Sequence, residues 1–136
     1  NKVKIVNEKY KAIEERFEDL CERYQYEDAE FVIRPAKNAG EIVEEGRTLH
    51  HCVGGDMYLN NHARGFTTIL FLRPTAERRV PFVTVEIRGF AIKQWYGAYD
   101  KKPMQKKIDR WLNRYLKALK NGMLRQGAAE RITEIA

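Results

Sequence analysis

The sequence has few cysteines and no long apolar run. Only two of its 136 residues are cysteine, Cys21 and Cys52, which is too few for a disulfide framework and fits a reducing compartment. No run of about 18 apolar residues occurs, and no charged and then apolar leader opens the chain. We therefore expect a soluble, cytoplasmic protein that does not enter a membrane.

Acidic residues are scarce in the last third of the chain. The formal net charge is +6, but acids gather near the N-terminus and in residues 41–45, whereas only Asp109 interrupts a long basic segment. We expect this segment to face a polyanion, and nucleic acid in particular. The alternative is that the lysines only keep a helix soluble. The candidate nucleic-acid-binding residues are Lys101, Lys102, Lys106, Lys107, Arg110, Arg114 and Lys117.

Length and composition suit one compact domain with a real core. The chain is 43% hydrophobic and contains no internal repeat or low-complexity segment. We expect a single domain over residues 1–121. For the tail, residues 122–136, the alternatives are a short helix, a frayed end and a docking segment for a protein partner.

Apolar residues with helical spacing mark several segments. Steps of three and four predict a helix over residues 10–24, whose stripe includes Cys21 as a buried side chain. An Asn with capping-box spacing to a Glu opens a second helix over 38–49. Asp56 begins a further helical turn. The longest stripe predicts a C-terminal helix over 103–121, with a proline at its start.

Between these helices the pattern becomes extended. Segments rich in β-branched and aromatic residues alternate with turn residues, and Arg88-Gly89 fits a two-residue hairpin turn. These segments predict strands over residues 31–34, 66–72, 80–87 and 90–96. The expected fold class is α+β: a three- or four-stranded antiparallel sheet packs against an N-terminal and a C-terminal helix, and the histidine-cysteine segment covers one end.

Residues 49–55, LHHCVGG, combine the only adjacent histidines with Cys52 and a glycine pair. Imidazole and thiol groups act as bases, nucleophiles or metal ligands near neutral pH, and glycines let the backbone approach a bound group closely. We therefore expect a polar pocket in which distant segments meet this one. The candidate residues for that pocket are His51, Cys52, Tyr58, Gln94 and Asp100.

Several chemistries compete for this pocket. Cys52 is a candidate nucleophile, although its neighbour His51 points elsewhere on a regular element and His62 is the only distant histidine. Alternatively, His51 moves protons in phosphodiester hydrolysis, with Lys101 and Lys102 as charge stabilisers. Zinc lacks the usual ligand spacing, so we expect no metal and no cofactor.

The remaining alternative is purely structural. The segment packs inward, a histidine binds a nearby backbone group and the glycines turn the chain. By the same reasoning Asp100 is an ordinary helix N-cap. Trp95 and Tyr96, which follow Gln94, are either packing residues or a surface on which a nucleobase stacks.

The chain also carries an ordered series of motifs. It consists of residues 45–54 (EGRTLHHCVG), Tyr58, residues 69–73 (ILFLR), residues 94–98 (QWYGA), Asp100 and Pro103. Between about residues 24 and 119, the chain resembles the PcfJ-like proteins of conjugative plasmids and phages. The resemblance implies a mobile-element setting in which the histidine-cysteine and QWYG motifs carry the function.

The favoured hypothesis is a nucleic-acid-associated accessory protein of a phage or conjugative element that holds the polar pocket. One alternative is an enzyme, either a phosphodiesterase or nuclease or a cysteine-dependent hydrolase, that uses His51 and Cys52. The other is a protein-interaction module that binds its partner through the tail.

Overall fold

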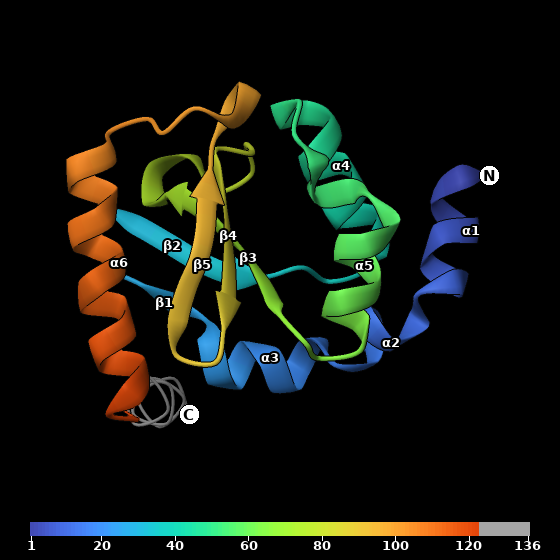
Figure 1. Cartoon of the computed structure of the whole chain (residues 1–136), viewed down its shortest axis with the longest axis horizontal. Coiled ribbons are helices and arrows are strands. Elements are labelled where there is room, and N and C mark those ends of the chain that lie inside the picture. Colours follow the sequence, from blue (N-terminus) through green and yellow to red (C-terminus); the bar gives the residue numbers. More distant parts are fainter. Residues whose placement is uncertain (123–136) are drawn as a thin grey trace.

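A five-stranded antiparallel sheet forms the middle layer, with helices on both faces (Figure 1). The computed structural model describes residues 1–122. Strands that follow one another in sequence are neighbours in the sheet, in the order β1-β2-β3-β4-β5. The strands are β1 (Tyr26–Glu27), β2 (Phe31–Pro35), β3 (Thr68–Pro74), β4 (Val83–Arg88) and β5 (Ala91–Tyr96).

The helices occupy the N-terminus, the connection between β2 and β3, and the C-terminal end of the described chain. They are α1 (Lys2–Lys9), α2 (Lys11–Glu15), α3 (Phe17–Tyr24), α4 (Ala39–Leu49), α5 (Asp56–Ala63) and α6 (Gln105–Lys120). A short 3₁₀ turn, η1 (Cys52–Gly54), joins α4 to α5, and another, η3 (Ala98–Asp100), follows β5.

Successive side chains of a strand point to opposite faces of the sheet, so each face has its own hydrophobic core. In β4, Val83 and Val85 point to one face, where side chains of α3 and α6 cover them. In β3, Ile69 and Phe71 point to the other face and pack under α2, α4 and α5. The sheet is therefore covered on both faces, and Figure 1 shows α6 and α4 on opposite sides of it.

The predicted α+β class, the antiparallel sheet and the packing of terminal helices are confirmed, but the predicted strand number is wrong. The structure has a fifth strand because β1 pairs with β2 through only two residues, Tyr26 with Ile33 and Glu27 with Val32. Two residues are too few to give a period in the sequence. The predicted helix over 10–24 is also divided: α2 begins at Lys11, and Arg16 separates it from α3.

Several predicted boundaries shift by one to three residues. The strand predicted over 66–72 is Thr68–Pro74, and the strand predicted over 80–87 begins at Val83. Arg88 pairs with Ala91, so the hairpin turn is Gly89-Phe90 and not Arg88-Gly89. Gly89 adopts φ +62°, which glycine tolerates without steric cost. The last helix begins at Gln105, two residues beyond the proline that was expected to open it. The predictions made for the tail concern residues from 123 onward, which lie outside the described range.

Two glycines bring α4 into backbone contact with the turn that follows it. A Cβ built on Gly46 would lie 2.8 Å from the backbone nitrogen of Gly54 and 3.1 Å from the carbonyl oxygen of His51. A Cβ on Gly54 would lie 3.0 Å from the Cα of Val43. Side chains at either position would force the backbones apart. The two glycines therefore fix where η1 sits against α4.

We predict that Gly46→Ala lowers the free energy of unfolding by about 2–3 kcal/mol, because the new methyl group meets backbone atoms that cannot move independently. The matched control is Gly55→Ala. Its Cβ meets only the carbonyl oxygen of Cys52, at 3.3 Å, so we expect a loss below about 1 kcal/mol. Urea unfolding measures both. Equal losses in the two variants would contradict the close contact.

Candidate functional site

All five candidate pocket residues line one cavity of about 450 Å³. The residues come from four separate segments of the chain: η1 and the residue before it, α5, the β4–β5 pair, and η3. The complete lining is His51, Cys52, Val53, Tyr58, Thr84, Glu86, Gln94, Tyr96 and Asp100. The sequence-predicted residues are thus brought together, along with three polar or aromatic side chains from the strands that extend the pocket wall.

The pocket lies on the sheet face that α4 and α5 cover. Thr84 and Glu86 alternate with the core valines of β4, and they pair directly with Tyr96 and Gln94 of β5. Because opposite residues in an antiparallel pair point to the same face, these four side chains form one polar patch. The patch is the floor of the pocket.

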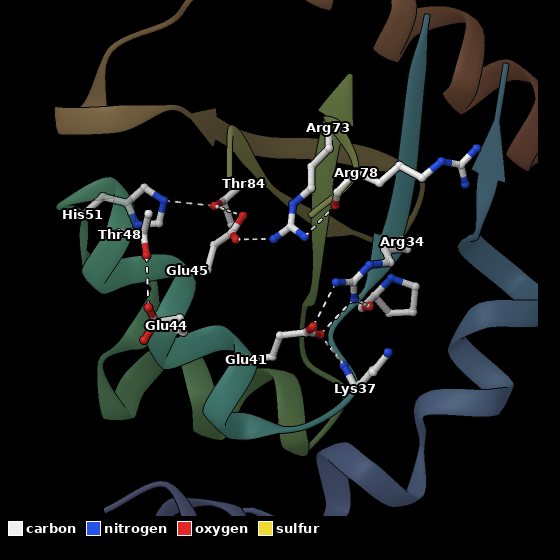
Figure 2. A network of polar contacts seen from close by, with 11 residues as sticks. Arg34, Lys37, Glu41, Glu44, Glu45, Thr48, His51, Arg73, Arg78 and Thr84 are labelled. Carbon is white, nitrogen blue, oxygen red and sulfur yellow. Dashed lines mark hydrogen bonds and ion pairs between the residues drawn. The ribbon is translucent and has the colours of Figure 1, made fainter. Parts of the chain in front are cut away.

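A chain of hydrogen bonds holds His51 against this floor (Figure 2). The Nδ1 atom of His51 accepts a hydrogen bond from the Val53 amide at 3.4 Å, which assigns the proton of the neutral ring to Nε2. Nε2 donates to Thr84 Oγ1 at 2.9 Å, and the Thr84 hydroxyl donates to Glu45 Oε2 at 3.3 Å. Partial burial lowers the pKa of His51, although the charge of Asp100 opposes this shift.

Glu45 ends this chain in a buried ion pair. Its carboxylate lies 2.6 Å from Nη2 of Arg73, and the two side chains are 1% and 7% exposed. Burial raises the pKa of Glu45, while the Arg73 charge and hydrogen bond act in the opposite direction. Arg73 also donates to the carbonyl oxygen of Arg78. The pair therefore fastens α4 to β3 directly behind His51.

A second ion pair lies one helical turn earlier on α4. Both guanidinium Nη atoms of Arg34, on β2, donate to Glu41 at 2.8 Å (Figure 2). Burial alone raises the pKa of Glu41, but the bonds from Arg34 and the Lys37 amide outweigh it, so the net pKa is lowered. The spacing of four residues points Glu41 and Glu45 of α4 at the sheet.

Glu86 anchors a separate network in the pocket floor. Its Oε2 accepts from Thr67 Oγ1 at 2.9 Å and its Oε1 from Gln94 Nε2 at 2.8 Å. The same Gln94 nitrogen lies 3.3 Å from the Tyr58 hydroxyl. Because Glu86 is only 4% exposed, these bonds fix the orientation of the Gln94 amide.

The two cysteines differ in their surroundings. Cys52 is exposed and free at the pocket lining, and no hydrogen bond joins it to His51 within the described residues. Cys21, predicted to be buried, is only half-buried in α3, and this burial raises the pKa of its thiol. Cys52 is therefore the accessible thiol of the site.

His62 lies outside the pocket. It is 1% exposed, its Nδ1 accepts from the Ile69 amide at 3.0 Å, and burial lowers its pKa to about 4. His62 is therefore neutral at physiological pH and stabilises the start of β3 as a structural residue. The distant base considered for Cys52 is not placed beside it.

The rim of the pocket concentrates unusual backbone conformations. His50, Tyr99 and Asp100 adopt φ values of 55°, 56° and 59°, in the left-handed region that side chains disfavour. The rings of His50 and Tyr99 stack at 4.5 Å between centroids, which links the end of α4 to η3. Backbone strain of this kind is often found at functional sites, where the surrounding structure maintains it.

The structural role expected of Asp100 is not the observed one. The N-cap position of α6 is Met104, and no side chain caps it. Asp100 instead lies at the pocket with an exposed carboxylate. Of the QWYG motif, Trp95 is buried in the core, whereas Gln94 and Tyr96 line the pocket.

The candidate nucleic-acid-binding residues are all exposed, but they do not line the pocket. Five of them lie on α6, which covers the opposite face of the sheet (Figure 1). Lys101 and Lys102 lie between the pocket and α6 in the sequence, since they directly follow the lining residue Asp100. Lys102 Nζ lies 5.0 Å from the centroid of the Trp95 ring and 5.5 Å from that of Tyr96.

Glu45, Arg73, Thr84 and Glu86 are the site residues that sequence reasoning missed. Glu45 shares the apolar face of its helix with Ile42 and Leu49, and buried acids on such a face indicate a partner. Arg73 continues the alternation of Ile69 and Phe71 in β3. Both patterns can be seen in the sequence, but neither shows that Glu45 and Arg73 are partners.

Residues 1–122 offer neither a metal site nor a membrane span. They contain no cluster of three or more histidine, cysteine, aspartate or glutamate side chains arranged to hold a metal ion. They also contain no helix with the length and apolar character needed to cross a membrane.

The model of the PcfJ-like protein family matches residues 1–112. The chain belongs to this family. It is also 31% identical over 119 residues to a Listeria innocua protein described as uncharacterized, Lin1253/Lin1744. The match covers 82% of this chain but 26% of that relative, so the chain spans about a quarter of the relative's length. No solved structure matches the chain.

Proposed function

We propose that this PcfJ-like chain is a nucleic-acid-associated accessory protein of a phage or conjugative element. The observation that supports the proposal best is a row of exposed cations that begins beside the pocket and continues along α6. Lys101 and Lys102 adjoin the pocket residue Asp100, and further cations follow on the helix. The mobile-element setting comes from the family resemblance.

Three of the cations on α6 share one face of the helix. Lys106, Arg110 and Lys117 are separated by four and seven residues, which brings them to the same side. At 1.5 Å per residue they span about 16 Å, several phosphates of one strand. No salt bridge engages these three side chains within the described residues. They are therefore available to phosphate groups.

Two other cations of the helix, Lys107 and Arg114, have acidic neighbours. Lys107 Nζ lies 2.8 Å from Glu30. Burial raises the pKa of Asp28, but hydrogen bonds and the nearby charge of Arg114 outweigh it, so the net pKa is lowered. Lys107 and Arg114 therefore contribute less to phosphate binding than the three unengaged cations.

We predict that affinity for a labelled single-stranded oligonucleotide falls at least tenfold between about 50 and 200 mM salt, because bound phosphates release counterions. Replacing Lys106, Arg110 and Lys117 together by alanine reduces the slope of log affinity against log salt by about 2, at roughly 0.7 per lost contact. Fluorescence anisotropy measures both.

The matched control replaces the exposed Lys2, Lys4 and Lys11 by alanine, which removes the same charge from α1 and α2. We expect the control to keep the wild-type slope. An affinity that is independent of salt, or an equal effect of the two triple variants, would contradict the role of α6.

One observation favours the enzyme hypothesis as a second candidate. The exposed Cys52 thiol and the His51 imidazole line the same pocket, so a substrate there would meet both. Against a nucleophilic role, Nε2 of His51 is directed to Thr84 and not to the sulfur. A tail-bound protein partner, the third hypothesis, involves residues outside the described range and stays a prediction.

We predict that His51→Gln leaves the rate at which iodoacetamide alkylates Cys52 unchanged, because Nε2 of His51 is directed to Thr84 and no hydrogen bond joins the imidazole to the sulfur within residues 1–122. The control is Cys52→Ser, which leaves only the half-buried Cys21 to react. A reaction that slows markedly in His51→Gln would support the cysteine-dependent enzyme instead.

A further inference from the structure

The pocket is rich in hydrogen-bond acceptors, and the carboxylate of Glu86 lies 3.9 Å from the Nζ atom of Lys93, which is not itself a lining residue. Two of its nine lining residues, Glu86 and Asp100, are carboxylates, and none is lysine or arginine. The Gln94 nitrogen already bonds to Glu86 and to the Tyr58 hydroxyl, so the amide oxygen is the group that Gln94 has left to offer. A group that binds the carboxylate of Asp100 and the free oxygen of Gln94 must bring donors, and the hydroxyls of Tyr58 and Tyr96 can donate to an acceptor on the same group.

Next to the carboxylates of the pocket lies a positively charged segment, which we call the mouth of the pocket. Lys101 and Lys102 follow Asp100, and Lys102 Nζ lies 5.5 Å from the ring of the lining residue Tyr96. A ligand that matches both zones has an anionic part outside the pocket and a donor-bearing part inside it. A nucleotide is divided in this way, whereas the positive mouth repels a lysine or arginine side chain that would suit the interior.

The shape of the site agrees with an aromatic ligand. The rings of Tyr58 and Tyr96 form part of the lining, and stacking on tyrosine is a general way to hold an unpaired base. The cavity of about 450 Å³ falls within the usual range of small-molecule sites, roughly 300–1,000 Å³.

We propose that the pocket binds one unpaired nucleobase that carries an amino group, and guanine before the others. This inference rests on the proposed function and names the part of the nucleic acid that the pocket takes. The N1–H and the exocyclic amino group of guanine are adjacent donors and bind both oxygens of one carboxylate. Uracil and thymine present a single donor between two acceptors.

Asp100 is the carboxylate placed for this contact. Glu86 already accepts from Thr67 and Gln94, whereas Asp100 has no hydrogen bond or ion pair within the described residues. Its exposed side chain lines the pocket, its backbone adopts a φ of 59°, and Lys101 follows it in the sequence. Asp100 therefore reads the base edge, and the adjoining lysines contact the flanking phosphates.

The experiment compares single-stranded oligonucleotides that differ at one position, which holds guanine, hypoxanthine or no base. Hypoxanthine lacks only the exocyclic amino group of guanine. For the wild type we expect guanine to bind at least threefold more tightly than hypoxanthine and at least tenfold more tightly than the abasic oligonucleotide. Fluorescence anisotropy at fixed salt measures the three affinities.

Asp100→Asn tests the assigned residue. Asparagine tolerates a positive φ and keeps the size of the side chain, so the fold should persist. We expect this variant to bind guanine and hypoxanthine equally while the salt dependence stays that of the wild type. Glu77→Gln, an exposed acid outside the pocket, is the matched control and keeps the guanine preference.

The outcomes separate this inference from the proposed function. Salt-dependent binding with equal affinity for all three oligonucleotides overturns the base pocket and leaves nucleic-acid binding intact. No salt-dependent binding to any oligonucleotide overturns the proposed function itself. Shifts of the Tyr58 and Gln94 NMR signals with N-acetylarginine amide, but not with guanosine monophosphate, would assign the pocket to a basic protein side chain and overturn the inference.

Discussion

A buried ion pair between Glu45 and Arg73 determines how the functional half of the molecule is arranged. Both side chains are almost completely removed from water, so each must have its partner to avoid an uncompensated charge. The pair joins α4 to β3, and Thr84 connects the same carboxylate to His51. Such a pair adds little net stability compared with apolar residues, but it permits few alternative arrangements. We infer that its main effect is to fix geometry.

The pocket follows from this constraint together with two others. Gly46 and Gly54 allow α4 and η1 to touch through their backbones, which places His51 and Cys52 at the end of the helix. The stacked rings of His50 and Tyr99 then join this end to η3 and Asp100. The structural and the functional interpretations of the EGRTLHHCVG motif are therefore compatible, because the packing of its glutamate and glycines is what presents its histidine and cysteine.

The sequence predicted more of the pocket than of its support. The histidine-cysteine segment, Tyr58, Gln94 and Asp100 were expected to meet in one pocket, and all of them line it, whereas Thr84 and Glu86 of the pocket floor were not expected. The partnership of Glu45 with Arg73 was not predictable, because local patterns do not say which residues meet across 28 positions. The same limit applies to β1, because a strand of two residues has no pattern of its own and is defined by its pairing with β2.

Charge counting had a similar limit. It identified the basic segment, and every member of it is exposed, but it did not reveal that α6 lies on the face opposite the pocket (Figure 1). It also did not reveal the acidic neighbours of Lys107 and Arg114. Only Lys101 and Lys102 belong to both regions. The nucleic acid in our proposal therefore passes from one face of the sheet towards the other around the loop before α6.

The most direct test of the ion pair's role is a double-mutant cycle on Glu45→Gln and Arg73→Met, read by urea unfolding. Each single change should cost about 3–5 kcal/mol, since it leaves one buried charge alone. The double change should cost about 2 kcal/mol less than their sum. Glu44→Gln, an exposed neighbour on the same helix, should cost less than about 1 kcal/mol. Additive losses, or single losses as small as that of Glu44→Gln, would contradict the central role of the pair.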